Sequence, residues 1–365
     1  MNNYKGENMI NLRKVGLTAL AGSLAAVSAQ AGEFAVSGGH VTTYTTGEAY
    51  NSAQGLGSKT NVNFSGSGEL DNGWSVSTFV LVNDAQGGVS SAASTVTMGD
   101  LGTIGVSKGG GFNVNGAYDE TYPRAYEENS DAGGQSAANY IGNWADDQAI
   151  VYQWPGMDIA GVSLSGGLEY SLQAGTATSN DGGVAANSDT WGAGYGIGLT
   201  ADTNMGLVVG AYYATRDNKN PNATKDVEDE WNGTWFANYS MGPISLGYQT
   251  VYVDSGLTGA ATTATATTAA KTVGTSAGQF EADNMSIAFN VNDDLSISYA
   301  EAEETYDSRN AATNTDVTQE SESLQIAYSM GSMSIKAYST EITNPNYDED
   351  AANLKKNEIA LGLAF

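Results

Sequence analysis

The chain of 365 residues has no cysteine, one histidine and five prolines. Without cysteine, neither disulfide bonds nor thiolate metal sites can form. A single imidazole, that of His40, disfavours histidine-based catalysis and histidine-rich metal centres. Scarce proline beside 46 glycines and 20 tyrosines is typical of many strands joined by short turns, and it disfavours a helical bundle.

Positive charge is also scarce. The 14 lysines and arginines stand against 41 aspartates and glutamates, which gives a formal net charge of −27. This charge repels phosphate backbones, so nucleic acid is excluded as a partner. No apolar run of helix length follows residue 31, so hydropathy alone would predict a soluble secreted protein. Hydropathy does not detect transmembrane barrels, whose strands are short and only alternately apolar.

Residues 1–31 have the layout of a secretory signal peptide. Arg13 and Lys14 precede an apolar stretch over residues 15–27, and the small-x-small sequence Ala-Gln-Ala ends at Ala31. The apolar stretch is shorter than the roughly 20 residues of a transmembrane helix. We therefore expect cleavage after Ala31 and one domain formed by residues 32–365.

Apolar residues alternate with small or polar residues along most of the remaining chain. At the end of the chain, "KKNEIALGLAF" places Ile359, Leu361, Leu363 and Phe365 on one side of an extended strand. Similar segments are predicted over 33–46, 58–70, 73–84, 92–99, 101–108, 146–155, 159–172, 190–200, 205–217, 227–240, 242–254, 279–291, 294–306, 316–330, 332–342 and 353–365.

The connections between these segments are alternately short and long. Tight turns such as Asp71-Asn72 and the four residues from Pro155 to Asp158 alternate with long polar stretches such as "TATSNDGGVAANSD". This pattern predicts an all-β fold, a transmembrane up-and-down antiparallel barrel of sixteen strands. The last strand should pair with the first, "EFAVSGGHVTTY", so that no unpaired edge meets lipid.

The start "GEFAVSGG", the end "LGLAF" and the hairpin "STVTMGDLGTIGVSKGG" resemble the general outer-membrane porins, particularly those of alphaproteobacteria such as Rhodobacter. The resemblance implies a homotrimer in the bacterial outer membrane, in contact with lipid and lipopolysaccharide. It also implies passive diffusion of ions and small hydrophilic solutes, without a cofactor. The terminal Phe365 resembles the signal that the outer-membrane assembly machinery reads.

In this family, the loop between strands five and six folds into the barrel and narrows the pore. The corresponding segment here spans about residues 109–145, and it carries Asp119, Glu120, Arg124, Glu127, Glu128 and Asp131. The acidic excess predicts a preference for cations. Alternation places a second set of charges on the lumen wall, namely Lys59, Glu69, Glu169, Arg216, Lys336, Lys356 and Glu358. Lys59, Lys336 and Lys356 lie on strands that become neighbours when the barrel closes, where they would oppose the acidic loop.

Two other classes of function remain open from the sequence. An outer-membrane barrel hydrolase would have to use His40 as its base, although this residue shares a strand face with Phe34, Val36 and Tyr44. A secreted acidic adhesin or surface-layer protein would also be rich in glycine and threonine, but it would not need the alternating connections or the terminal phenylalanine. Clustered carboxylates in the loops could bind Ca²⁺, although no EF-hand spacing is present.

Overall fold

The computed structural model describes residues 32–48, 54–84, 88–172, 174, 191–219, 228–257, 270–309 and 316–365. The predicted signal peptide lies outside these ranges, and its cleavage stays a prediction. No helix in the described ranges has the length and apolar character needed to cross a membrane.

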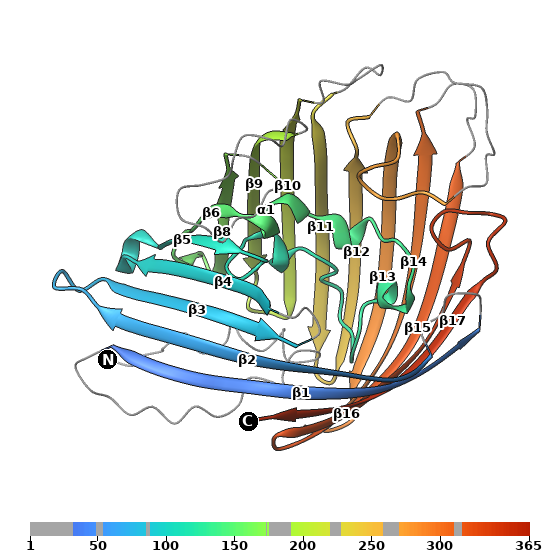
Figure 1. The fold of residues 1–365 in the computed structure, drawn as a ribbon, viewed down its shortest axis with the longest axis horizontal. Helices are drawn as coiled ribbons and strands as arrows, with labels where there is room; N and C mark the ends of the chain where they lie inside the picture. The colour runs from blue at the N-terminus through green and yellow to red at the C-terminus, as the bar shows by residue number, and fades with distance from the viewer. Residues whose placement is uncertain are drawn as a thin grey trace.

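Almost all of the regular structure is β-strand (Figure 1). The strand segments are β1 (Glu33–Glu48), β2 (Gly55–Glu69), β3 (Ser75–Asn83), β4 (Gly88–Thr97), β5 (Thr103–Lys108), β6 (Ala149–Gln153), β7 (Met157–Ile159), β8 (Val162–Ser171), β9 (Trp191–Asp202), β10 (Leu207–Asn218), β11 (Glu230–Met241), β12 (Ile244–Asp254), β13 (Gly278–Asn290), β14 (Leu295–Ser308), β15 (Val317–Met330), β16 (Met333–Thr343) and β17 (Leu354–Ala364). The helices are α1 (Asn143–Asp147) and the 3₁₀ turns η2 (Gly99–Leu101), η3 (Asn115–Ala117), η4 (Asn129–Ala132) and η5 (Ala138–Tyr140).

The strands form one closed antiparallel barrel. Each strand pairs with its neighbour in the sequence, and β17 pairs with β1. The segments β6 and β7 both pair with β8 and act as two parts of a single strand. The barrel therefore has sixteen strands, as the alternation predicts, and every predicted segment overlaps one of them.

One predicted turn is wrong. The tight turn lies at Ala160 and Gly161, not between Pro155 and Asp158, because β7 continues β6 and forms the hairpin with β8. Pro155 has no N–H to donate, so it interrupts the strand without reversing it. Ala160 and Gly161 both have positive φ, 53° and 85°, as two-residue hairpin turns that match the strand twist require.

The two faces of the barrel differ as the sequence predicts. On β15, Leu324 and Ile326 are 61% and 44% exposed on the outside, whereas Gln325 between them is 2% exposed. On β17, Leu361 is exposed, while its neighbours Ala360 and Gly362 are buried. Large apolar side chains thus cover the outer face, and small or polar ones face the lumen.

The C-terminal residue closes the barrel seam. The pairing runs from Gly39 opposite Ala364 to Glu48 opposite Lys355, and Phe365 extends it by two hydrogen bonds. Its N–H donates to the carbonyl of Gly38 at 3.0 Å, and its carbonyl accepts from the N–H of Gly38 at 2.8 Å.

Deletion of Phe365 is therefore expected to reduce the amount of folded barrel in the outer membrane sharply. It removes both hydrogen bonds at the seam and the residue that resembles the assembly signal. Heat-modifiable migration of outer-membrane fractions on a denaturing gel measures the folded fraction. Phe365→Tyr, which keeps the backbone and an aromatic ring, should assemble normally, and wild-type levels of the deletion variant would contradict the expectation.

Candidate functional site

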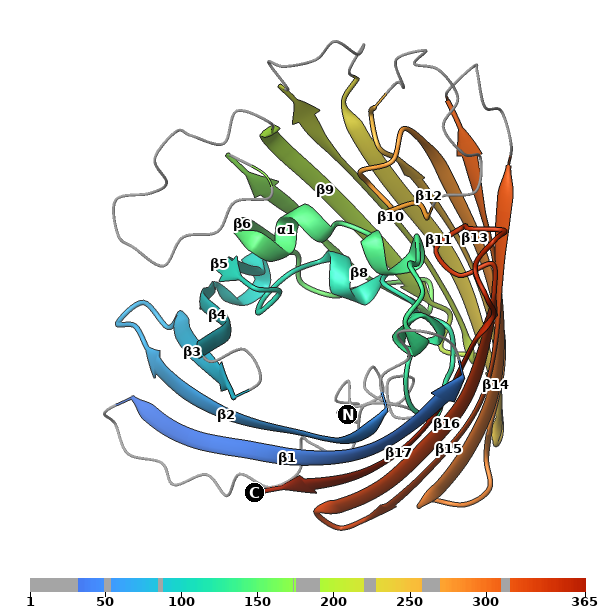
Figure 2. The ribbon, with the colours of Figure 1, turned by 45° about the vertical axis from the view of Figure 1, so that its right-hand side comes forward.

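The segment between β5 and β6, residues 109–148, is called the inner loop here. Figure 2 shows it inside the ring of strands, including η3, η4, η5 and α1. Within the described ranges, its hydrogen bonds to the wall go to β5, β6, β8, β9, β10, β11, β12, β14, β15 and β17. Lumen-facing side chains of β2 and β3, such as Ser67 and Ser77, remain exposed. The open passage therefore runs along the side of β2 and β3.

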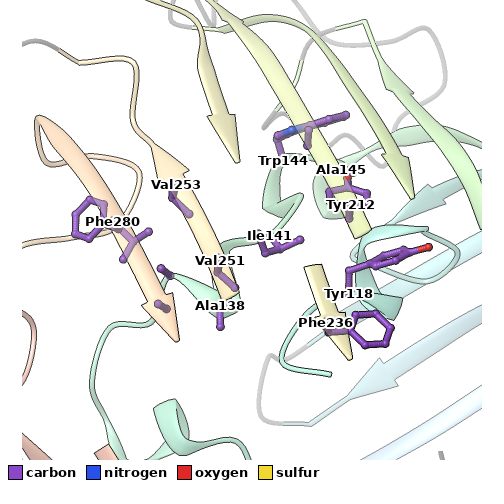
Figure 3. Packing of buried hydrophobic residues seen from close by; sticks show 14 of the residues in the cluster. Tyr118, Ala138, Ile141, Trp144, Ala145, Tyr212, Phe236, Val251, Val253 and Phe280 are labelled. Atoms are coloured by element: carbon purple, nitrogen blue, oxygen red, sulfur yellow. The ribbon is translucent and has the colours of Figure 1, made fainter. Parts of the chain in front are cut away.

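An apolar core joins the inner loop to the wall (Figure 3). Tyr118, Ile141 and Trp144 of the loop are each 1% exposed, and they belong to one cluster with wall residues that include Tyr212 and Phe236. The rings of Tyr118 and Tyr212 stack with centroids 5.3 Å apart. Burial of each large side chain contributes about 1.5–3 kcal/mol, so apolar packing holds this part of the loop against the wall.

Glycines on β9 make this packing possible. A Cβ atom at Gly194 would lie 2.8 Å from the Trp144 ring, and one at Gly198 would lie 2.3 Å from the Tyr118 ring. Larger residues at these positions would displace the loop. The alternate glycines of "WGAGYGIGLT" are visible in the sequence, but the rings that they accommodate are not.

A buried carboxylate anchors the start of the inner loop. Glu169 of β8, which is 2% exposed, accepts hydrogen bonds from the backbone N–H groups of Val114 and Asn115, the latter at 3.1 Å. It also accepts one from the Tyr212 hydroxyl at 2.6 Å. Glu169 faces the lumen, as alternation predicts, but the loop covers it.

Glu169→Leu is expected to destabilise the barrel, because it leaves three buried donors without a partner. Each such donor costs about 1–3 kcal/mol. Urea unfolding in detergent, followed by tryptophan fluorescence, measures the difference. Glu69→Leu removes the same charge from an exposed position on β2 and should unfold at the wild-type midpoint. Equal midpoints for the two variants would show that Glu169 does not anchor the loop.

The end of the inner loop has a second polar anchor. Arg216 of β10, 8% exposed, forms an ion pair with Glu230 at 2.6 Å and lies 3.5 Å from the ring centroid of Trp191. The Tyr140 hydroxyl of the loop lies 3.0 Å from both Arg216 and Glu230. Like Glu169, Arg216 is a buried anchor and does not line the open passage.

The acidic part of the loop is folded around one arginine. Arg124 pairs with the Glu128 carboxylate at 2.5 Å and donates to the backbone carbonyl of Glu120. The carboxyl group of Glu120 lies close to that of Glu128, and the carboxyl group of Glu127 lies close to that of Asp131. Two neighbouring carboxyl groups can share a hydrogen bond only when one of them carries a proton.

Burial is the main cause of raised pKa values in this cluster. It raises the pKa of Asp119 to about 7, with a further contribution from the nearby Glu128 charge. It raises the pKa of Glu127 to about 8, together with the hydrogen bond to Asp131. The pKa of Glu120, which is 1% exposed, is raised well above its ordinary value by burial and by Glu128. Asp119 and Glu127 therefore change charge around neutral pH.

Besides Glu169 and Arg216, three of the predicted lumen charges contact the loop, close to its acidic segment. The Lys356 ammonium donates to the carbonyl of Asp131 at 2.7 Å, and the Lys336 ammonium lies 5.1 Å from the centroid of the Tyr126 ring. The Tyr126 hydroxyl donates to Glu358 at 3.0 Å.

The other two charges lie on β2, where both are exposed. In the part of the chain that the structure describes, neither Lys59 nor Glu69 forms a hydrogen bond or ion pair with the loop. Lys59 pairs with Val41 of β1, whereas Lys356 pairs with Gly47. Six residues of strand separate these levels by about 20 Å. Lys59 and Lys356 therefore do not form one basic cluster.

His40 lies on the outer face of β1. Its ring nitrogens lie 2.9 Å from the Thr60 hydroxyl and 3.0 Å from the Thr42 hydroxyl. Among the described residues, no group of three or more His, Asp or Glu side chains is arranged to hold a metal ion. The predicted loop Ca²⁺ therefore has no preformed ligand set in these ranges.

The chain matches a protein family, and its fold is similar to those of solved outer-membrane proteins. The model of the Gram-negative porin family matches residues 16–293. OmpF of Salmonella typhi in complex with daunomycin has a TM-score of 0.64 at 13% identity, over 91% of this chain and 97% of that one. The anion-selective porin from Comamonas acidovorans has a TM-score of 0.59 at 12% identity, over 92% and 100% of the two chains.

OmpT of Vibrio cholerae, an outer membrane protein, has a TM-score of 0.60 at 13% identity, over 93% of this chain and 99% of that one. No curated protein sequence matches the chain. At these identities the solved structures show the fold alone, whereas the family model covers most of the sequence. The chain, a closed sixteen-stranded barrel with a polar lumen, belongs to the family of Gram-negative porins.

Proposed function

We propose that the chain forms a water-filled channel for passive diffusion of ions and small hydrophilic solutes across the outer membrane, with a preference for cations. The observation that carries this proposal is the acidic segment 119–131, which is held inside the barrel. It bears five acidic side chains, Asp119, Glu120, Glu127, Glu128 and Asp131, against the single Arg124, and its negative charge increases as those with raised pKa values ionise. Fixed charges in a narrow, low-dielectric passage concentrate the field and raise the local concentration of counter-ions.

The fold does not decide the sign of this preference. The Comamonas porin has a similar fold and is anion-selective by its name. The preference must therefore come from the side chains in the passage. In this chain, Lys336 and Lys356 are next to the loop, but the acidic groups outnumber them.

The test is to neutralise four loop carboxylates together, with Asp119→Asn, Glu120→Gln, Glu127→Gln and Glu128→Gln. In a planar bilayer with a KCl gradient, the zero-current potential should move toward the anion side. The matched control removes four carboxylates from the outer face, with Asp283→Asn, Glu301→Gln, Glu303→Gln and Glu320→Gln. These residues share strand faces with the exposed Met285, Tyr299 and Leu324, so the control should keep the wild-type potential. An unchanged potential in the loop variant would place the loop outside the ion path.

The assembly that we propose is a homotrimer. The outer face of β1–β4 departs from the apolar pattern at His40, Thr42, Thr60, Thr78 and Ser94, and the hydroxyls of Thr78 and Ser94 lie 2.9 Å apart. Hydrogen-bonded polar side chains are better suited to a contact between copies than to lipid. We also propose that the chain is of the Rhodobacter type within the family, since its first and last strands resemble those of Rhodobacter porins. The same resemblance supports contact with lipopolysaccharide and dependence on the assembly machinery.

A channel driven by concentration gradients needs neither a cofactor nor catalysis, and we propose that this protein uses none. The hydrolase alternative depends on His40. Replacement of this residue by Gln should leave conductance unchanged, and lipid hydrolysis that disappears with the substitution would favour the alternative.

A further inference from the structure

Two buried glutamines on the wall hold the backbone of the inner loop on either side of its acidic segment. Gln249 of β12 is 0% exposed and Gln325 of β15 is 2% exposed. Both face the lumen, since Tyr248 and Leu324, their neighbours in the sequence, lie on the other face. A buried primary amide normally needs partners for its oxygen and for both of its N–H groups.

Both glutamines satisfy these groups largely with the loop. The Oε1 atom of Gln249 accepts from the N–H of Thr121 at 2.8 Å, and its Nε2 donates to the carbonyl of Tyr118 at 2.6 Å. The remaining N–H of Gln249 donates to the Thr234 hydroxyl at 3.0 Å.

Gln325 repeats this arrangement. Its Oε1 accepts from the N–H of Tyr126 at 2.7 Å, and its Nε2 donates to the carbonyl of Glu127 at 2.5 Å. The remaining N–H donates to the Ser323 hydroxyl at 3.0 Å. Each side-chain amide thus pairs with backbone peptide groups as a neighbouring strand would, with a donor and an acceptor side by side.

The loop runs across the strands between these two glutamines. Residues 121–126 pass from β12 to β15, three strand spacings of about 4.8 Å each. Five residues in a helix would advance only about 7.5 Å, whereas extended residues reach up to about 17 Å. The structure has no helix in this segment. Ser298 of β14, between the two strands, accepts from the N–H of Ala125 at 2.8 Å.

We propose that Gln249 and Gln325 are positioning residues that fix the acidic segment in the passage and thereby set the conductance and charge preference of the channel. Asp119, Glu120 and Arg124 lie next to or between the two attachment points. Glu127 is part of the second attachment point, and Glu128 follows it directly. This inference rests on the proposed channel function and names the residues that determine its selectivity.

The first test replaces both glutamines by methionine, which has a similar length and forms no comparable hydrogen bonds. Single-channel recordings should show at least two conductance levels per subunit where the wild type shows one. The zero-current potential in a KCl gradient should move at least twofold closer to zero, since the charges are no longer held in the ion path. Ser245→Ala alters another buried lumen side chain on β12, whose hydroxyl lies 2.9 Å from that of Ser240, and it should behave as wild type.

The second test distinguishes positioning from a general effect on folding. Gln325→Glu keeps the shape of the side chain, but an ionised carboxylate has no donor for the carbonyl of Glu127. A protonated carboxyl group regains one donor and one acceptor. The conductance levels and zero-current potential of the variant should therefore differ from those of the wild type at pH 9 and equal them at pH 5, with both proteins measured at the same pH.

The outcomes separate the two proposals. Wild-type protein that forms no channels would overturn the proposed function itself. If the wild type forms cation-preferring channels and the double methionine variant keeps the same conductance and zero-current potential, only the role of the glutamines is overturned. If the double variant does not assemble, the Gln325→Glu variant is the test. A conductance or zero-current potential that differs from the wild type at pH 5, or equals it at pH 9, would overturn the positioning role.

Discussion

Replacement of Ile287 by arginine is expected to destabilise the barrel folded in a bilayer by about 2–4 kcal/mol if the residue lies near the membrane midplane. Ile287 is on the outer face of β13 and is 44% exposed. Its cross-strand neighbours are Leu246 on β12 and Tyr299 on β14, both also exposed. An arginine there would place its charge in the apolar band, whereas the lumen face of the same strand meets water or protein.

The matched control places the same charge on the lumen side. Ser67 of β2 is exposed on the face opposite Phe64, so Ser67→Arg should fold with wild-type stability and change conductance. Denaturant titration of refolding into lipid vesicles gives both free energies. Equal destabilisation by the two arginines would mean that the outer and inner faces have been assigned incorrectly.

The cation preference of the channel is expected to rise as the pH increases from 6 to 9. Asp119 and Glu127 have pKa values raised to about 7 and about 8. A carboxyl group below its pKa is neutral, so both groups are largely protonated at pH 6 and ionised at pH 9. Two additional negative charges in the passage then attract cations more strongly.

Other groups around the cluster modify this change without reversing it. Arg124, Asp146 and Glu128 act on Asp119, and Tyr126 and the Lys336 ammonium lie close to Glu127. Zero-current potentials recorded between pH 6 and 9 measure the effect, which should be largest at low salt because the Debye length is about 10 Å at 0.1 M. The variant Asp119→Asn with Glu127→Gln should show a flat profile. A flat wild-type profile would show that these carboxyl groups are ionised throughout or lie outside the ion path.

The barrel itself could be predicted from the sequence because its cause is local. Alternation of large apolar and small residues follows directly from a strand with lipid on one side, and each strand carries this pattern independently. The turn at Ala160 and Gly161 was predicted wrongly because Pro155 and Gly156 are strong local turn signals, whereas the continuation of β6 into β7 depends on pairing with β8. Tertiary pairing prevailed over local preference.

The lumen was less predictable because its contents come from a distant segment. Alternation places Glu169 and Arg216 correctly on the inner face, but their burial depends on where the inner loop packs. Gln249 and Gln325 occupy alternate strand positions like any other lumen-facing residue, and nothing in the sequence connects them to residues 118–127. The glycines of β9 were the one local sign that something large packs against that wall.

Channel formation and cation preference are tested most directly by a planar-bilayer recording of the purified wild-type protein in a KCl gradient. We expect discrete conductance steps and a zero-current potential on the cation side that declines as the salt concentration rises. The absence of conductance, or an anion-side potential that persists at low salt and pH 8, would contradict this expectation.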